Sequence, residues 1–135
     1  MRPLAGELLL AAWEEGAPEH DLGRALTMLA TALPGTDREQ LGALPIAERN
    51  LLLLRLHELS FGPWLSVFGI CAGWCSSHEL LDLDMARFLW MEVRAAARRL
   101  LGEIHQLASA YGWSERAIAG MSPGRRAAYL EMLSA

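Results

Sequence analysis

The sequence predicts an all-α fold: a compact domain of several helices, with one long helix in its C-terminal half and a short irregular middle segment. Three observations support this fold class. Apolar residues make up 53% of the 135 residues, which is enough for one hydrophobic core. They recur at spacings of three and four residues, as they do along one face of a helix. Most of the glycines and prolines lie at the joints between these apolar stretches.

The first part of this single domain, residues 1–62, is expected to hold the N-terminal helices. A short helix covers about residues 4–15 and ends at a glycine and a proline. A second helix covers about residues 19–33, where Pro34-Gly35 ends it. The apolar stripe of this second helix consists of Leu22, Ala25, Leu26, Leu29 and Leu33.

Two further helices are predicted before residue 62. Thr36 with Glu39 three residues later has the spacing of a capping box, which predicts a brief helix to Leu44. Pro45 suits the start of a stronger helix over residues 46–61. Leucines fall on more than one side of that helix, which favours either central burial or a protein interface.

Residues 63–83 form the middle segment, and we expect them to be irregular. Aromatic and β-branched residues occur there together with glycines, which permits a loop, a short hairpin or a helical turn. We favour a loop with little strand.

The third part, residues 84–135, begins with the longest predicted helix, over residues 85–111. Asp84 is its expected N-cap, and Gly112 suits the position after its last turn. Its apolar stripe steps by three or four residues throughout: Leu89, Val93, Ala96, Leu100, Ile104, Leu107 and Tyr111.

Two short helices are expected to complete the chain. Ser114 is the expected cap of a helix that ends at Gly120. Ser122-Pro123 opens the last helix, which runs to Leu133.

The charge pattern argues against a nucleic-acid partner. The net charge is −4, and all 12 basic residues are arginines; the first 67 residues carry 5 Arg and 9 acids, whereas the rest carries 7 of each. Neutralisation of phosphates drives binding to nucleic acids, so an acidic chain is a poor candidate. Residues 111–133 resemble a helix-turn-helix with Arg116, Arg125 and Arg126 towards phosphate, but two short helices around a turn are also common scaffolding.

We expect neither a signal peptide nor a membrane span, and therefore cytoplasmic residence. Glu7 interrupts the N-terminal apolar run, and no cleavage site of small residues follows it. The longest uncharged stretch, Leu59 to His78, contains three glycines and a proline and is a poor spanning helix.

One cluster has residues that zinc prefers. Cys71, Cys75 and His78 lie close together, but a zinc site normally needs a fourth ligand, and His57 and Asp82 have no motif spacing. Two buried thiols beside a surface histidine explain the same residues, and we expect no metal or other cofactor. No phosphate-binding loop and no nucleophile paired with a base is present, so we expect no catalytic site.

The five tryptophans are many for this length. Tryptophans usually lie in the core, but with their apolar neighbours they exceed what a thin helical domain buries. The segment from Phe61 to Trp64 and the pair Leu89-Trp90 could therefore form an exposed patch for a partner.

Two blocks of the sequence resemble one known family. LPIAERNLLLLRLHELSFGPWL (44–65) and DLDMARFLWMEVRAAARRLLGEIHQLASAYGWSERAIAGMSPGRRAAYLEML (82–133) are similar to blocks of the T-even-type phage baseplate hub assembly chaperone family. Members are encoded with contractile phage tails and phage-tail-like injection systems. The resemblance covers most of the chain, and the C-terminal block is the more specific one.

The middle of the chain departs from the family pattern. Family members are usually longer and have a β-containing middle region bounded by Cys-Pro-x-Cys-Gly pairs. Here that region is reduced to about residues 66–81 with one Cys-x-x-x-Cys, so the chain looks like a shortened member. The resemblance implies a role in assembling the baseplate and implies no reaction.

The hypothesis is that the chain binds a baseplate hub component or another tail protein without catalysing a reaction. The alternatives are a structural baseplate subunit that stays in the particle and, less favoured, a helix-turn-helix DNA-binding regulator. The sequence leaves the oligomeric state open. The residues expected to contact the partner are aromatic or arginine anchors: Phe61, Trp64, Phe88, Trp90, Tyr111, Trp113, Arg125, Arg126 and Tyr129.

Overall fold

The computed structural model describes residues 1–63 and 83–134, and within them it confirms the all-α fold class. These residues are 77% helical, without a strand among them. The helices are α1 (Glu7–Gly16), α2 (Asp21–Ala32), α3 (Arg38–Ala43), α4 (Ile46–Phe61), α5 (Met85–Tyr111), α6 (Glu115–Ala119) and α7 (Pro123–Ser134). The expected irregular or hairpin segment and its cysteines fall almost wholly on residues 64–82, outside the described residues.

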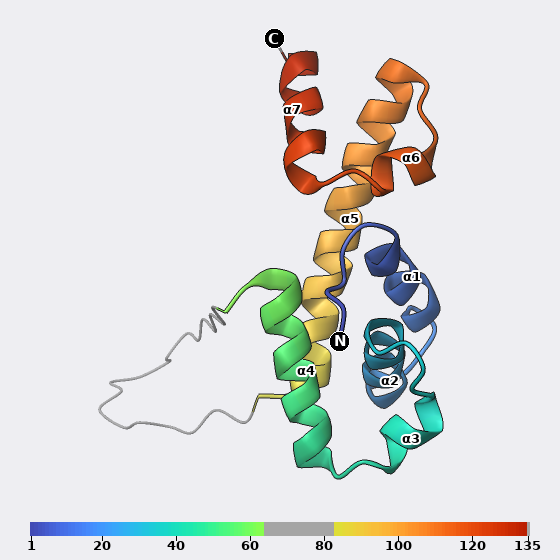
Figure 1. The fold of residues 1–135 in the computed structure, drawn as a ribbon, viewed down its shortest axis with the longest axis vertical. Helices are drawn as coiled ribbons and strands as arrows, with labels where there is room; N and C mark the ends of the chain where they lie inside the picture. The colour runs from blue at the N-terminus through green and yellow to red at the C-terminus, as the bar shows by residue number, and fades with distance from the viewer. Residues whose placement is uncertain (64–82, 135) are drawn as a thin grey trace, which may run out of the picture.

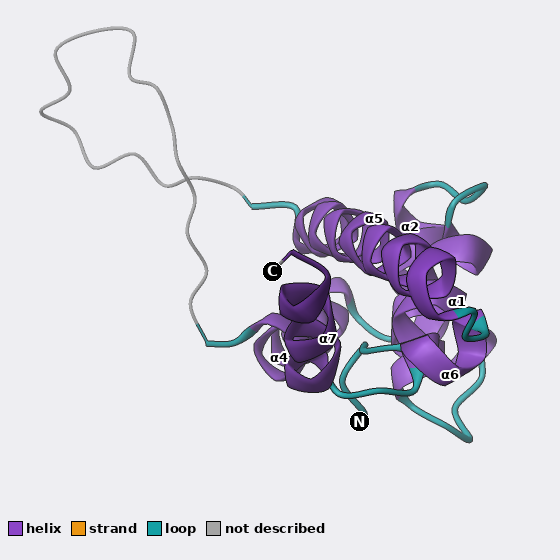
Figure 2. Cartoon of the chain, turned by 90° about the horizontal axis from the view of Figure 1, so that it is seen from above, coloured by secondary structure: helices purple, strands orange, loops and turns teal. Residues whose placement is uncertain are grey.

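Helix α5 is the axis of the molecule and is shared by two regions (Figure 1). The N-terminal lobe consists of residues 1–63 and 83–100, in which α1, α2 and α4 pack on the first half of α5 and α3 connects α2 to α4. The C-terminal arm consists of residues 101–134, in which α6 and α7 pack on the far end of α5. Figure 2, seen from above, shows α7 in front of α4, with α5 running beside them.

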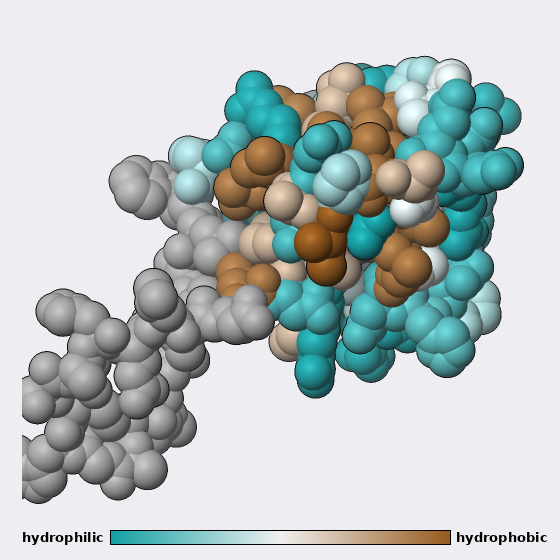
Figure 3. Space-filling view, turned by 90° about the horizontal axis from the view of Figure 1, so that it is seen from below, coloured by the Kyte–Doolittle hydropathy of each residue, from teal (hydrophilic) through white to brown (hydrophobic). Residues whose placement is uncertain are grey.

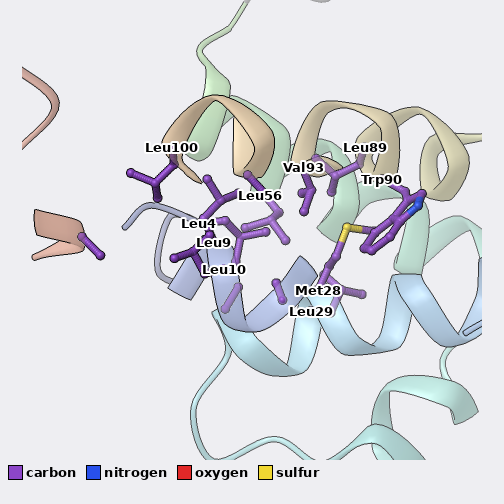
Figure 4. Close-up of a cluster of buried hydrophobic side chains, with 14 of the residues drawn as sticks. Leu4, Leu9, Leu10, Met28, Leu29, Leu56, Leu89, Trp90, Val93 and Leu100 are labelled. Atoms are coloured by element: carbon purple, nitrogen blue, oxygen red, sulfur yellow. The ribbon is translucent and has the colours of Figure 1, made fainter. Parts of the chain in front are cut away.

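The core of the lobe is aliphatic and lies where four helices meet (Figure 4). α5 contributes one face of its helix, including Leu89, Val93 and Leu100, each at most 3% exposed. α4 contributes Leu53 and Leu56. Residues of α1 and α2 close the core from the other side: Leu9, Leu10, Ala12, Ala25, Met28, Leu29 and Ala32.

The helix ends in the second half of the chain are confirmed. The carboxylate of Asp84 accepts a hydrogen bond from the backbone N–H of Arg87 at 3.1 Å and thus caps α5. Gly112 has a φ of 69° and ends α5 in the left-handed conformation that glycine tolerates best. The hydroxyls of Ser114 and Ser122 accept from backbone N–H groups at the starts of α6 and α7, each at 3.3 Å.

Two predicted boundaries near the N-terminus are wrong. α1 begins at Glu7 and not at residue 4, because Gly6 has a φ of 53° and breaks the helical path. A Cβ at Gly6 would lie only 2.5 Å from the carbonyl oxygen of Ala119 in the arm, so a tertiary contact sets this start. The capping box of α3 is formed by Asp37 and Gln40, one residue later than the predicted Thr36 and Glu39.

Candidate protein-binding surfaces

The outer side of α4 exposes aliphatic side chains. Leu53 and Leu56 face the core, whereas Leu51 is 66% exposed and Ile46 is 68% exposed. Since a helix turns 100° per residue, a dense run of leucines cannot all face one neighbour. We call the exposed aliphatic residues of this helix the α4 surface: Ile46, Leu51, Leu54 and Leu59.

The start of α4 also borders a hollow of about 350 Å³ at the lower end of the lobe. The first turns of α2, α4 and α5 line it, with apolar side chains that include Leu22 and Ile46. Four polar or charged residues line it too: Asp21, Arg49, Asn50 and Asp84. Figure 3, which looks at the molecule from below, shows hydrophobic residues gathered on this face. The hollow extends the α4 surface onto the end of the lobe.

The tip of the arm brings four of the predicted contact residues together. Tyr111 and Trp113 stack with their ring centres 4.5 Å apart. Tyr129 of α7 lies edge-on to Trp113 at 4.9 Å, and the guanidinium of Arg125 lies 5.8 Å from the Tyr129 ring centre. The rings are half-buried or exposed, so they both hold α7 against α5 and remain accessible in part.

Three predicted contact residues take part in the packing of the lobe. Phe61 and Phe88 are half-buried and flank the ring of His57, at 5.7 and 5.5 Å between ring centres. His57 is itself buried, and its Nδ1 has no hydrogen-bond partner among the described residues. Trp90 is only 7% exposed, because Gly16 leaves room for its ring and Arg24 covers it at 5.0 Å. Its side chain is therefore not presented to a partner.

Arg126, another predicted anchor, is buried at the base of the arm. Its Nε donates to a carboxylate oxygen of Glu103 at 2.6 Å, and its Nη1 donates to the carbonyl of Met121 at the same distance. Only 8% of the Arg126 side chain is exposed, against 34% of Glu103. This pair ties α7 to α5 and leaves Arg126 unable to reach a partner.

Trp64, the last predicted contact residue, lies outside the described residues, as do the candidate zinc ligands Cys71, Cys75 and His78. Within residues 1–63 and 83–134, no three histidine, cysteine, aspartate or glutamate side chains come close enough to hold a metal ion. In the same part of the chain, every helix is either too short or too polar to span a bilayer.

The structure therefore adds residues that we did not predict as contacts. The prediction concentrated on aromatic and arginine anchors, whereas the most exposed of the large apolar side chains are aliphatic, with Ile46 and Leu51 first among them. The sequence did carry a signal for them, because the leucine run of α4 is apolar on more than one side. It did not carry one for Leu22, which lies on the α2 stripe but is 53% exposed at the open end of the lobe.

Comparison with protein-family models, with curated proteins and with solved structures finds no match to this chain.

Proposed function

We propose that this chain is a non-catalytic protein-binding factor that assists assembly of a contractile, phage-tail-like baseplate by binding a hub component. The resemblance of residues 44–65 and 82–133 to the baseplate hub assembly chaperone family supports this role. The first of these blocks contains α4, and the second contains α5, α6 and α7.

The observation that carries the protein-binding part of the proposal is the exposure of the α4 surface. Ile46 and Leu51 each expose about two thirds of their surface, and Leu54 and Leu59 each expose more than one third. Fully burying one such side chain contributes about 1.5–3 kcal/mol. Burial of these side chains by a partner would therefore stabilise the complex. Aliphatic residues beside a hollow suit an apolar segment of that partner.

The experiment is co-expression of the tagged chain with the products of neighbouring tail genes. We expect the wild-type chain to recover a hub component, and the Leu51→Asp variant to lose it because a carboxylate replaces the centre of the α4 surface. Met132→Asp is the matched control: Met132 is 65% exposed and lies on α7, in the other region of the molecule, so its replacement should leave recovery unchanged.

Recovery of no tail protein by the wild-type chain would contradict the proposal, and so would equal recovery by Leu51→Asp. Mass spectrometry of purified particles separates an assembly factor from a retained component. An assembly factor should be absent from the finished particle, whereas stoichiometric presence would replace this role by that of a structural baseplate subunit.

A further inference from the structure

The arginines of the chain divide into two groups. Eight of the twelve have a hydrogen-bond, ion-pair or aromatic-ring partner: Arg2, Arg24, Arg38, Arg49, Arg55, Arg116, Arg125 and Arg126. The other four side chains have no such partner in the described part of the chain, and all four belong to α5: Arg87, Arg94, Arg98 and Arg99.

Three of these four arginines lie in a row. Seven and eleven residues correspond to about two and three turns of a helix, so Arg87, Arg94 and Arg98 are within about 20° of one line along α5. All three are exposed, and Met91, which is 62% exposed, lies between Arg87 and Arg94 near the same line. We call these four residues the α5 ridge. Along the axis its arginines are about 10 Å and about 6 Å apart.

The positive charges of the ridge repel one another in the unbound chain. Arg94 and Arg98 are four residues apart, and like charges at this spacing destabilise a helix. No carboxylate lies three or four residues from either of them to offset the repulsion. The ridge therefore has positive charge that an anionic partner would neutralise, and an exposed methionine that adapts to an apolar contact.

The charge of the remaining molecule indicates which anion fits. Without the four arginines of α5, eight arginines stand against sixteen carboxylates, so the ridge is a basic strip on an otherwise acidic protein. A long polyanion such as duplex DNA would meet repulsion beyond the strip. A short acidic helix with one apolar residue would contact the strip alone, and the surrounding charge would help to orient it.

We propose that the α5 ridge is the docking site for an acidic helical segment of a partner protein. This inference rests on the proposed protein-binding role, but it does not depend on the partner being a tail component. Carboxylates of that segment pair with Arg87, Arg94 and Arg98, and an apolar side chain covers Met91.

The test uses the whole chain and a fluorescein-labelled, alanine-rich helical peptide whose glutamates repeat the spacing of the ridge around one leucine. A second peptide carries glutamine in place of each glutamate, and a duplex DNA is the third probe. Fluorescence anisotropy should show binding of the glutamate peptide at low salt, weaker binding at about 0.15 M salt, and at least about tenfold weaker binding of the glutamine peptide.

Arg94→Glu is the decisive variant, because it should weaken peptide binding by at least about tenfold. The same change places a glutamate four residues before Arg98, the favourable order for an ion pair in a helix, so we expect the variant to be at least as stable as the wild type. Loss of binding then cannot be ascribed to unfolding. Arg55→Glu on α4 changes the net charge equally and should leave binding unchanged, since Arg55 lies on another helix.

Equal binding of the two peptides, equal binding by Arg94→Glu, or tighter binding of the DNA would each overturn the inference. The outcome is separable from the proposed function. If the glutamate peptide does not bind while a hub component still co-purifies, the α5 ridge is not a docking site. If the peptide binds and no tail protein is recovered, the baseplate role is wrong and the docking site on the ridge is retained.

Discussion

The N-terminal lobe and the C-terminal arm share α5 but differ in the interactions that hold their outer helices. In the lobe, α1, α2 and α4 surround one half of α5 with aliphatic side chains that exclude water. In the arm, α5 is contacted by the five-residue α6 and by α7, which has Arg126 as its one buried residue. Leu107 of α5 and Ile118 of α6 are buried in the arm as well, but α7 has no fully buried apolar side chain. It is attached by an ion pair at its base and an aromatic cluster near its middle.

This difference indicates where each region is sensitive. Apolar burial is spread over many residues and tolerates polar changes poorly. A charged pair that is partly buried depends on both partners, since either one alone is left without compensation. We therefore expect the lobe to be sensitive to the loss of buried volume and the attachment of α7 to be sensitive to the loss of charge.

The largest effect should come from Leu56→Ala in the lobe. Leu56 is fully buried, and its truncation leaves a cavity in the core where α4 packs on α5, so we expect a loss of about 2–5 kcal/mol in the free energy of unfolding. Chemical denaturation measures this loss. Leu51→Ala, the same change on the same helix at a position that is 66% exposed, should alter stability by no more than about 0.5 kcal/mol. Similar losses for both variants would contradict the assigned orientation of α4.

The next effect should come from Glu103→Ala in the arm. The change leaves the guanidinium of Arg126 buried without its carboxylate, and we expect a loss of about 2–3 kcal/mol, below the cost for a fully buried pair because Glu103 is 34% exposed. Glu58→Ala breaks the surface pair with Arg55 and should cost less than about 1 kcal/mol. The double variant with Arg126→Met should recover much of the loss, and failure to do so would show that charge is not what the arm requires.

The contact between the two regions is tested by Gly6→Ala. Its positive φ alone should cost about 1–2 kcal/mol, and the close approach to the carbonyl of Ala119 adds to that cost. Gly35→Ala is the control, because Gly35 has a φ of 90° but open space where a Cβ would lie. The difference in unfolding free energy between the two variants measures the contact between lobe and arm. Equal effects would mean that α1 does not press on α6.

The smallest effect should be an increase in stability, from Gly102→Ala. Gly102 lies inside α5 where lobe and arm meet, and nothing is within 4 Å of the position of an added Cβ. Gly102→Ala should therefore stabilise the chain by about 0.5–1 kcal/mol through helix propensity. Hydrogen exchange should slow in the arm more than in the lobe, because the arm depends more on the continuity of α5. A uniform slowing would show that the two regions open together.

Most of the helices could be predicted because their ends are encoded locally. Asp84, Gly112 and Ser114 act through groups within four residues, so their patterns are visible in the sequence. The start of α1 could not be predicted, since Gly6 responds to Ala119 on another helix. The cap of α3 was ambiguous because both Thr36 with Glu39 and Asp37 with Gln40 have the right spacing.

The candidate surfaces were less predictable, for a physical reason. Hydrophobic spacing identifies a stripe but not the neighbour that covers it. Leu22 is exposed although it lies on the predicted stripe of its helix, and Trp90 is buried although it lies off the predicted stripe of α5. The burial of Trp90 depends on Gly16 and Arg24, which are far from it along the chain. Likewise, the α5 ridge becomes visible only when the other eight arginines are seen to have partners.

Because α5 is one unbroken helix, it sets the distance between two sites on its surface. Seventeen residues separate Arg94 from Tyr111, which corresponds to about 25 Å along a straight helix. The rigid helix thus holds the α5 ridge and the aromatic cluster of the arm at a fixed distance from each other. A single partner that contacts both sites must be at least that long. Two smaller partners, one bound at each site, would be held about that far apart by the helix.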